Sequence, residues 1–156
     1  MQHLLSLVKS EEVEVLDAGS GPHAITLCEF VNGVSMEITS IDHRDFPGVI
    51  KMSMEALTYP DSSFDIVQCI NALDHTKNAV QALKELIRVA RGAVYIDCAL
   101  DQHSTSGGWH YWDAKEDGTF TNGNESFNLK DYGFKIEYIN NGGERRYNHI
   151  IARLQK

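Results

Sequence analysis

The stretch that most constrains the fold of this chain runs from Val13 to Gly21. In it, a short apolar run ends on Asp17 and breaks at Gly19 and Gly21. Pro22 follows, and proline is favoured at the first position of a helix. A buried strand that turns through glycines into a helix brings backbone N–H groups and the positive end of the helix dipole to one place. We therefore predict a strand–turn–helix unit that binds an anionic group, with Asp17 able to accept hydrogen bonds from hydroxyls or an ammonium.

Strands and helices are expected to alternate along the rest of the chain. Short apolar runs predict strands over residues 13–18, 35–41, 49–54, 64–70, 92–100, 134–139 and 147–154. Helices are predicted over residues 2–9, 22–31, 79–90 and 129–132. Turn residues at 115–118 and 140–143 predict two hairpins, the second between the last two strands. We therefore predict an α/β fold with an open, mainly parallel sheet of about seven strands, helices on both faces and a C-terminal antiparallel hairpin.

The helix over residues 79–90 carries the clearest pattern of the chain. Its apolar residues recur at helical spacing, while its charged residues fall on the opposite face. Asn78 is a favourable N-cap, and Gly92 stands where a C-terminal stop is expected. The sequence therefore predicts an amphipathic helix that packs on the sheet.

Length and charge limit the classes of protein that this chain can represent. With 156 residues, we expect a single domain over residues 1–156. The formal net charge of -8 disfavours general binding to nucleic acids, because contacts with phosphates need a basic face. The sequence contains no apolar segment long enough to span a bilayer, so we expect no membrane partner.

The three cysteines are widely spaced and lie in apolar contexts, at Cys28, Cys69 and Cys98. This pattern is typical of buried free thiols in a reducing compartment, so we predict a cytoplasmic protein. The cysteines and histidines show none of the close spacings of zinc-binding pairs. We therefore predict no metal site.

Several stretches occur in the order and at the spacing of one enzyme family. They are residues 16–21 (LDAGSG), 38–42 (ITSID), 57–67 (LTYPDSSFDIV), 71–75 (NALDH) and 82–92 (ALKELIRVARG). Together they resemble the motifs of class I S-adenosylmethionine-dependent methyltransferases, in particular the type-11-like subgroup. The resemblance extends over about residues 13 to 100 and implies a Rossmann-like sheet that binds S-adenosylmethionine beside its first strand.

The resemblance implies roles for the residues that end the first two strands. Gly19 and Gly21 would let the backbone approach the methionine part of the cofactor. Asp17 would hold the ammonium group, directly or through water. Asp42 would accept both ribose hydroxyls, since a carboxylate can take two donors at once.

Two further pairs of residues complete the implied cofactor site. Asn71 and Ala72, just past the fourth strand of the family pattern, would flank the methionine moiety. Ser53 stands where the family often has an acid that contacts the adenine amino group, and Met54 follows it.

His75 and His110 are the candidate catalytic residues. Methyl transfer to an oxygen or nitrogen needs alignment and a base, and His75 is a candidate base; the alternative is a polar loop that caps the next helix or contacts the cofactor. Residues 109–112 (WHYW) resemble a segment after strand five in a branch of these enzymes. His110 would contact substrate there, unless the aromatic residues form a cluster that covers the sheet.

We predict a minimal methyltransferase that uses S-adenosylmethionine and an unidentified acceptor, such as a small molecule or a peptide. The short chain leaves little material for a substrate lid, so a second subunit or a large acceptor is expected to close the pocket. It also motivates an alternative, a non-catalytic cofactor-binding or regulatory module of the same fold. A third reading is a nicotinamide oxidoreductase, because 19–24 (GSGPHA) fits the dinucleotide fingerprint, although Asp17 would repel a pyrophosphate.

Overall fold

The computed structural model describes residues 12–22, 30–31, 34–100, 110–140 and 148–156. The main sheet contains β1 (Glu12–Ala18), β2 (Phe30–Val31), β3 (Val34–Asp42), β4 (Ile50–Lys51), β5 (Phe64–Ile70), β6 (Ala90–Ala99), β10 (Lys135–Ile139) and β11 (His149–Gln155). A small second sheet contains β7 (Asp113–Ala114), β8 (Thr119–Thr121) and β9 (Ser126–Asn128). The helices are η1 (Leu73–His75), α2 (Ala79–Val89) and η2 (Leu129–Tyr132).

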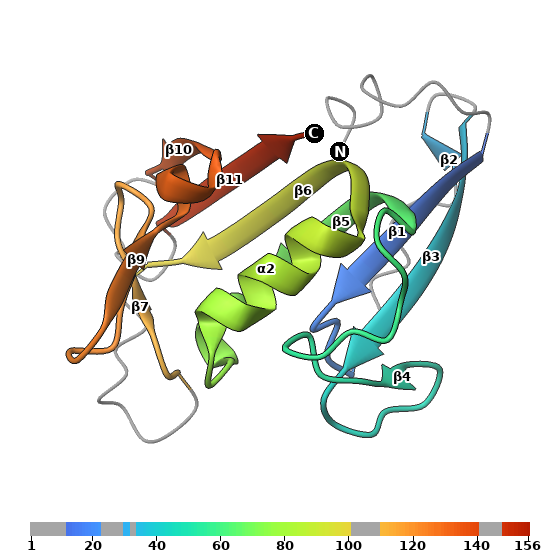
Figure 1. Ribbon diagram of the computed structural model, residues 1–156, viewed down its shortest axis with the longest axis horizontal. Helices are drawn as coiled ribbons and strands as arrows, with labels where there is room; N and C mark the ends of the chain where they lie inside the picture. Colours follow the sequence, from blue (N-terminus) through green and yellow to red (C-terminus); the bar gives the residue numbers. More distant parts are fainter. Residues whose placement is uncertain (1–11, 23–29, 32–33, 101–109, 141–147) are drawn as a thin grey trace.

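The main sheet has the strand order β10-β11-β6-β5-β1-β3-β2, and β4 pairs with β3 (Figure 1). Strand β1 runs parallel to β3 and β5, and β5 runs parallel to β6. Strand β11 is antiparallel to both β6 and β10. This topology confirms the predicted open, mainly parallel sheet and its C-terminal antiparallel hairpin.

Burial explains why β1 and β5 lie in the middle of the sheet. Their apolar side chains, including Leu16, Ile66 and Val67, are completely buried. Parallel strands are covered on both faces, so they need continuous apolar runs. The carboxyl ends of β1, β3 and β5 consequently lie at one edge of the sheet, where open α/β folds bind ligands.

Helix α2 covers one face of the sheet (Figure 1). Its buried face contains Ala79, Leu83 and Leu86, which join the main hydrophobic core. The Asn78 side chain accepts a hydrogen bond of 3.0 Å from the backbone N–H of Gln81, as the predicted N-cap requires.

Gly92 is not the helix stop that its position predicted. Helix α2 ends at Val89, and β6 begins at Ala90 without a connecting turn. Gly92 lies within β6, where an added Cβ atom would be 2.8 Å from the backbone oxygen of Asp65. The position therefore needs glycine because two strands approach closely, and a local pattern cannot distinguish this requirement from a cap.

Two other predicted elements differ from the structure. The strand expected over 49–54 is only Ile50–Lys51, and the end of the helix expected over 22–31 is the strand Phe30–Val31, which pairs with β3. Residues 23–29 and the helix predicted over 2–9 lie outside the described residues.

The described cysteines match their predicted state. Cys69 and Cys98 are free and buried, and burial raises the pKa of both thiols, to which the nearby carboxylate of Asp74 contributes. Cys28 lies outside the described residues. Within the part of the chain that the structure describes, no helix has the length and apolar character needed to cross a membrane.

The contact between Gly92 and Asp65 predicts the effect of Gly92→Ala. The added methyl group would press against the Asp65 carbonyl, so we expect the free energy of unfolding to fall by about 1–3 kcal/mol in urea titrations. Lys84→Ala, on the exposed face of α2, is the control and should change it by less than about 0.5 kcal/mol. Equal effects of the two substitutions would contradict the close approach.

Candidate functional site

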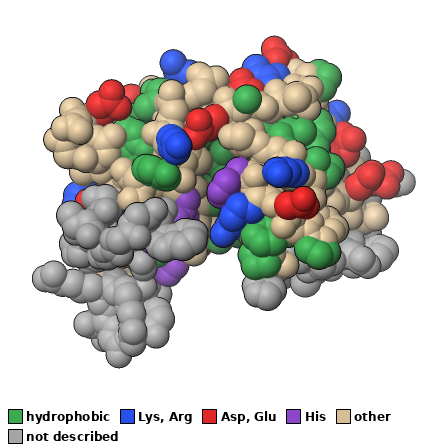
Figure 2. Space-filling model, turned by 90° about the horizontal axis from the view of Figure 1, so that it is seen from below, with side chains coloured by type: hydrophobic (Ala, Val, Ile, Leu, Met, Phe, Trp, Pro, Cys, Tyr) green, Lys and Arg blue, Asp and Glu red, His purple; other side chains and the backbone are tan. Residues whose placement is uncertain are grey.

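A cavity of about 630 Å³ lies at the carboxyl ends of β1, β3 and β5. Figure 2 views this end of the molecule, where histidine, lysine and arginine side chains surround a hollow. The predicted site residues that line the cavity are Gly19, Gly21, Asp42, Ser53, Met54, Asn71, Ala72 and His75. They come from segments separated by up to about a third of the chain, so the fold brings together most of the site that the sequence predicts.

The glycine turn after β1 forms one wall of the cavity. Gly19 and Gly21 have φ angles of +79° and +66°, in the left-handed region that favours glycine. A Cβ atom at Gly19 would be 2.4 Å from Cβ of Ala72 and 2.9 Å from Cε of Met54. Glycine at this position therefore allows the turn to approach the loop after β5.

Hydrogen bonds fasten the turn to the end of β3. The backbone N–H groups of Gly19 and Ser20 both donate to the Ile41 carbonyl, at 2.9 and 3.0 Å. The N–H of Gly21 donates to Oδ2 of Asp42 at 3.0 Å. The residues that end β1 and β3 therefore form one rigid unit.

Asp42 is a buried carboxylate in the wall of the cavity. Its Oδ1 accepts from the backbone N–H and the Nε of Arg44, at 2.9 and 3.2 Å. Burial alone would raise the pKa of Asp42, but the hydrogen bonds from Arg44 and Gly21 outweigh it and lower the pKa below its usual range. The site therefore contains an ionised acceptor of hydrogen bonds. Arg44, which also lines the cavity, was missed because a charge two residues after an acid has no distinctive pattern.

Asp17 lies behind the glycine turn and does not line the cavity. Its Oδ1 accepts a hydrogen bond of 3.0 Å from Nε2 of Gln68, its neighbour across β1 and β5. Among the described residues, neither Oδ2 of Asp17 nor Oε1 of Gln68 has a hydrogen-bond partner. Burial raises the pKa of Asp17, although the hydrogen bond from Gln68 opposes this shift. Asp17 is thus placed to support the turn.

Asn71 shapes the loop that follows β5. Its φ of +48° turns the chain sharply, and its N–H donates to the Asp97 carbonyl at 2.8 Å. Its side-chain Oδ1 accepts from the N–H of Ala99 at 2.8 Å. These bonds join the ends of β5 and β6, and they hold Asn71 and Ala72 at the cavity wall.

Ser53 and Met54 also line the cavity. The Ser53 hydroxyl accepts from the N–H of Glu55 at 3.2 Å. Glu55 also lines the cavity, and its carboxylate accepts from the N–H of Asn78 at 3.2 Å. Glu55 was not predicted as a site residue, although it stands two positions after Ser53.

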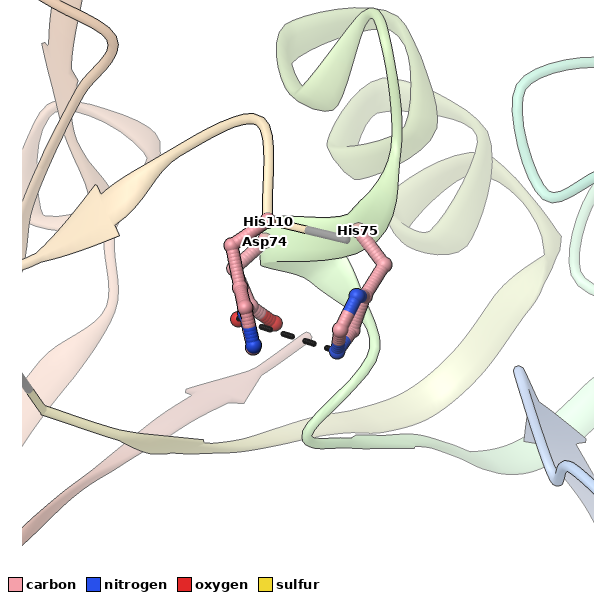
Figure 3. A group of neighbouring side chains, drawn as sticks. All are labelled: Asp74, His75 and His110. Atoms are coloured by element: carbon pink, nitrogen blue, oxygen red, sulfur yellow. Dashed lines mark hydrogen bonds and ion pairs between the residues drawn. The ribbon is translucent and has the colours of Figure 1, made fainter. Parts of the chain in front are cut away.

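His75 and His110 lie close to each other and to Asp74 (Figure 3). The contact between Nδ1 of His110 and Oδ2 of Asp74 is 2.5 Å, and Nε2 of His75 lies 3.9 Å from the same oxygen. The two imidazole rings are 4.1 Å apart between centroids. His75 lines the cavity, whereas His110 lies beside His75 and does not line it.

Trp112 belongs to the core and not to the cavity wall. It is buried, packs edge-on against Phe127, and donates from Nε1 to the Thr76 carbonyl at 3.1 Å. For this residue the structure supports the aromatic-cluster alternative, while Trp109 lies outside the described residues. The exposed neighbour Tyr111 lines the cavity instead, and its place next to the candidate residue His110 was the one signal that could have indicated it.

The geometry agrees with comparisons to known proteins. Residues 16–96, just over half of the chain, match the family of methyltransferase domains. The chain therefore belongs to this family. Its fold and motifs are those of class I S-adenosylmethionine-dependent methyltransferases, and the family implies S-adenosylmethionine as the cofactor. No curated protein sequence matches the chain.

Solved structures share the fold at low sequence identity. A methyltransferase from Aquifex aeolicus described as SAM-dependent matches with a TM-score of 0.60 and 16% identity, over 99% of this chain and 87% of that one. The [4+2]-cyclase SpnF matches with a TM-score of 0.62 and 13% identity, over 99% and 78%. The Bacillus subtilis protein YcgJ matches with a TM-score of 0.52 and 21% identity, over 64% of this chain and only 49% of YcgJ.

The contacts of Gly19 predict different effects for alanine at the two turn glycines. Both substitutions force a side chain into positive φ, which costs about 1 kcal/mol. Only Gly19→Ala also creates a clash, with Ala72 and Met54, whereas Gly21 has open space around it. We expect Gly19→Ala to lower the free energy of unfolding by about 1–3 kcal/mol more than Gly21→Ala in urea titrations. Similar losses would show that the turn does not depend on the approach to Ala72.

The raised pKa of Asp17 predicts a stability effect with a definite sign. Asp17 binds its proton more tightly in the folded chain than in the unfolded chain, so protonation of Asp17 stabilises the fold. This stabilisation is complete below the ordinary pKa of 3.8 and is lost as the pH rises through the raised pKa. Asp17→Asn carries no charge and keeps the acceptor for Gln68. We expect it to increase the free energy of unfolding relative to the unsubstituted protein more at pH 8 than at pH 4.

Asn124→Ala, in the exposed turn between β8 and β9, is the control; it removes no titratable group and should shift stability equally at the two pH values. Urea titrations of both variants provide the comparison. A pH-independent effect of Asp17→Asn would contradict the raised pKa.

Proposed function

We propose that this chain transfers the methyl group of S-adenosylmethionine to an acceptor bound at the carboxyl ends of β1, β3 and β5. The observation that carries the proposal is the convergence of the predicted cofactor residues, all except Asp17, on one cavity. S-adenosylmethionine supplies an electrophilic methyl group when it is bound. The residues of this chain bind it, orient it and present the acceptor.

Asp42 is the proposed partner of the ribose hydroxyls. A carboxylate accepts several hydrogen bonds, and those from Gly21 and Arg44 keep Asp42 ionised while it faces the cavity. Ser53 and Met54 would contact the adenine. The same arrangement disfavours a dinucleotide, because the N–H of Gly21 that a pyrophosphate would need already donates to a carboxylate.

The methionine part of the cofactor would lie along the glycine turn and the loop after β5. Gly19, Gly21, Asn71 and Ala72 line the cavity there, and Gly19 leaves the space that a side chain would fill. Asp17 lies behind the cavity wall that the glycine turn forms. It would therefore act on the ammonium group through a bridging water or through the backbone of this turn. His75 and His110 are the proposed catalytic residues on the acceptor side.

The acceptor side of the cavity carries the exposed apolar residue Tyr111, and Ile50 in β4 is a second large exposed apolar residue among those described. Ile50 is 48% exposed, and Tyr111, which lines the cavity, is 43% exposed. We infer that a second copy of the chain or a large acceptor covers this side, while a small molecule would bind inside the cavity.

We further propose that residues 1–156 form one cytoplasmic domain.

One observation favours a second candidate function. The [4+2]-cyclase SpnF shares this fold, so the fold also supports a protein that is not described as a methyltransferase. The chain would then bind the cofactor without transferring its methyl group. Formation of S-adenosylhomocysteine in the presence of small-molecule and peptide panels separates the two functions. Binding without product in every panel would favour the second.

Calorimetric titration with S-adenosylmethionine and S-adenosylhomocysteine tests the cofactor site. We expect Asp42→Ala to weaken binding by about 1–3 kcal/mol because it removes the acceptor for the ribose hydroxyls. Asp42→Asn preserves the shape and one acceptor oxygen, so it should lose less. No heat and no thermal shift with millimolar ligand would overturn the proposal.

Asp61→Ala is the matched control for this titration. Asp61 pairs with Arg88, its side chain is 78% exposed, and it does not line the cavity. It should therefore retain full affinity. A titration with the nicotinamide dinucleotide tests the third reading, and we expect no binding.

A further inference from the structure

We propose that Asp74, His75 and His110 form a binding site for a divalent transition-metal ion beside the cavity (Figure 3). Each residue offers one ligand atom, and these atoms all lie within 4.8 Å of one another. Two imidazole nitrogens and one carboxylate oxygen suit zinc and its first-row neighbours, whereas magnesium and calcium prefer oxygen ligands.

The distances within the cluster are close to those of a metal site. Ligand atoms bound to one tetrahedral zinc ion at about 2.0 Å lie about 3.3 Å apart. The distances from Oδ2 of Asp74 to Nδ1 of His110 and to Nε2 of His75 are 2.5 and 3.9 Å, which bracket this value. Shifts of less than about 1 Å at each side chain would therefore place the three atoms around one ion.

The charge of Asp74 gives a reason for a cation at this place. Its side chain is only 3% exposed, and Oδ1 has no hydrogen-bond partner among the described residues. A buried carboxylate is costly unless it is paired or coordinates a metal. Both histidines present a nitrogen to Oδ2, and a divalent ion between the three atoms would satisfy all of them together.

The cluster is held by the backbone, so the ligands are already positioned. Asp74 and His75 belong to η1, which follows β5 after only a short turn. His110 comes from a segment 36 residues away, and the N–H groups of Tyr111 and Trp112 fasten it to the Asp74 carbonyl at 2.8 and 3.2 Å. Ligands fixed in this way lose little conformational freedom when a metal binds.

The sequence predicts no metal site because its ligands are not close in the chain. Asp74 and His75 are adjacent, so they lack the spacing of three or four residues by which metal ligands on a helix are recognised in a sequence. His110 is brought to them by the tertiary contacts of Tyr111 and Trp112. The site is therefore a property of the fold.

The position of His75 indicates what the metal would do. His75 lines the cavity together with Tyr111, so coordination positions that the protein leaves open would face the acceptor side. A cation there would bind an acceptor hydroxyl and lower its pKa, in place of the general base expected from the sequence. The acceptor oxygen would then form its bond to the methyl carbon as the bond from that carbon to sulfur breaks, and the hydroxyl proton would leave to water. This role rests on the proposed function, whereas metal binding itself does not.

The chain contains an internal comparison for the cluster. Nδ1 of His149 lies 2.8 Å from Oδ1 of Asp97, so this is an ordinary histidine–aspartate pair. Among the described residues, it belongs to no group of three metal-ligating side chains, whereas Asp74 has two histidines. His149→Ala therefore removes a histidine–aspartate contact without removing a proposed ligand.

The test is a titration of the chelator-treated full chain with zinc chloride, by calorimetry and by metal analysis after dialysis. We expect one equivalent of zinc at micromolar affinity and no binding of magnesium. His75→Ala and His110→Ala should each weaken zinc binding at least about 100-fold, and His149→Ala should not. Cobalt in place of zinc should give the visible absorption bands of a tetrahedral nitrogen–oxygen site, and these bands should disappear in His75→Ala.

The outcomes separate this inference from the proposed function. Absence of zinc binding to the unsubstituted chain, or equal binding by the His75→Ala and His149→Ala variants, would overturn the metal site and leave a histidine–aspartate pair. S-adenosylmethionine titrations of the same metal-free samples test the cofactor site independently. Circular dichroism of each variant at the titration temperature shows whether a loss of zinc reflects unfolding, and Asp74→Asn, which keeps the shape of the side chain, should also lose zinc.

Discussion

The hydrogen bonds between the turn after β1 and the end of β3 are the constraint on which the rest of the site depends. Gly19 and Ser20 share one carbonyl acceptor, and Gly21 donates to the carboxylate that ends β3. This arrangement uses donors that would otherwise be free to bind an anion, and it keeps Asp42 ionised. The turn therefore supports an acceptor of hydrogen bonds, and the pocket beside it suits a ligand with hydroxyl groups.

Much of the fold could be predicted because its signals are local. The apolar runs of β1 and β5, the pattern of α2 with its Asn78 cap, and the final hairpin all depend on residues close in sequence. The acids and glycines at strand ends could be placed together since parallel strands end at one edge of the sheet. The same reasoning failed at Gly92, where the requirement comes from Asp65 on the neighbouring strand.

The parts of the site that sequence reasoning missed depend on contacts between distant segments. Tyr111 lines the cavity because its N–H binds the Asp74 carbonyl, and Arg44 lies there because it pairs with Asp42. Asp17 was expected at the ligand but lies behind the turn, against Gln68. Spacing predicts which strand end a residue occupies, but the side to which its side chain turns depends on packing.

The two hydrogen bonds that Asn71 makes with β6 limit how the sequence of such a protein can change in evolution. Its backbone and its side chain both bind β6, so the loop that leads to Ala72 begins from an anchored residue with little freedom to lengthen. Insertions and deletions are better tolerated in the small sheet of β7, β8 and β9, which carries none of the proposed cofactor residues. A lineage built on this scaffold could therefore exchange its acceptors by rebuilding this sheet, while the loops that hold the cofactor stay unchanged.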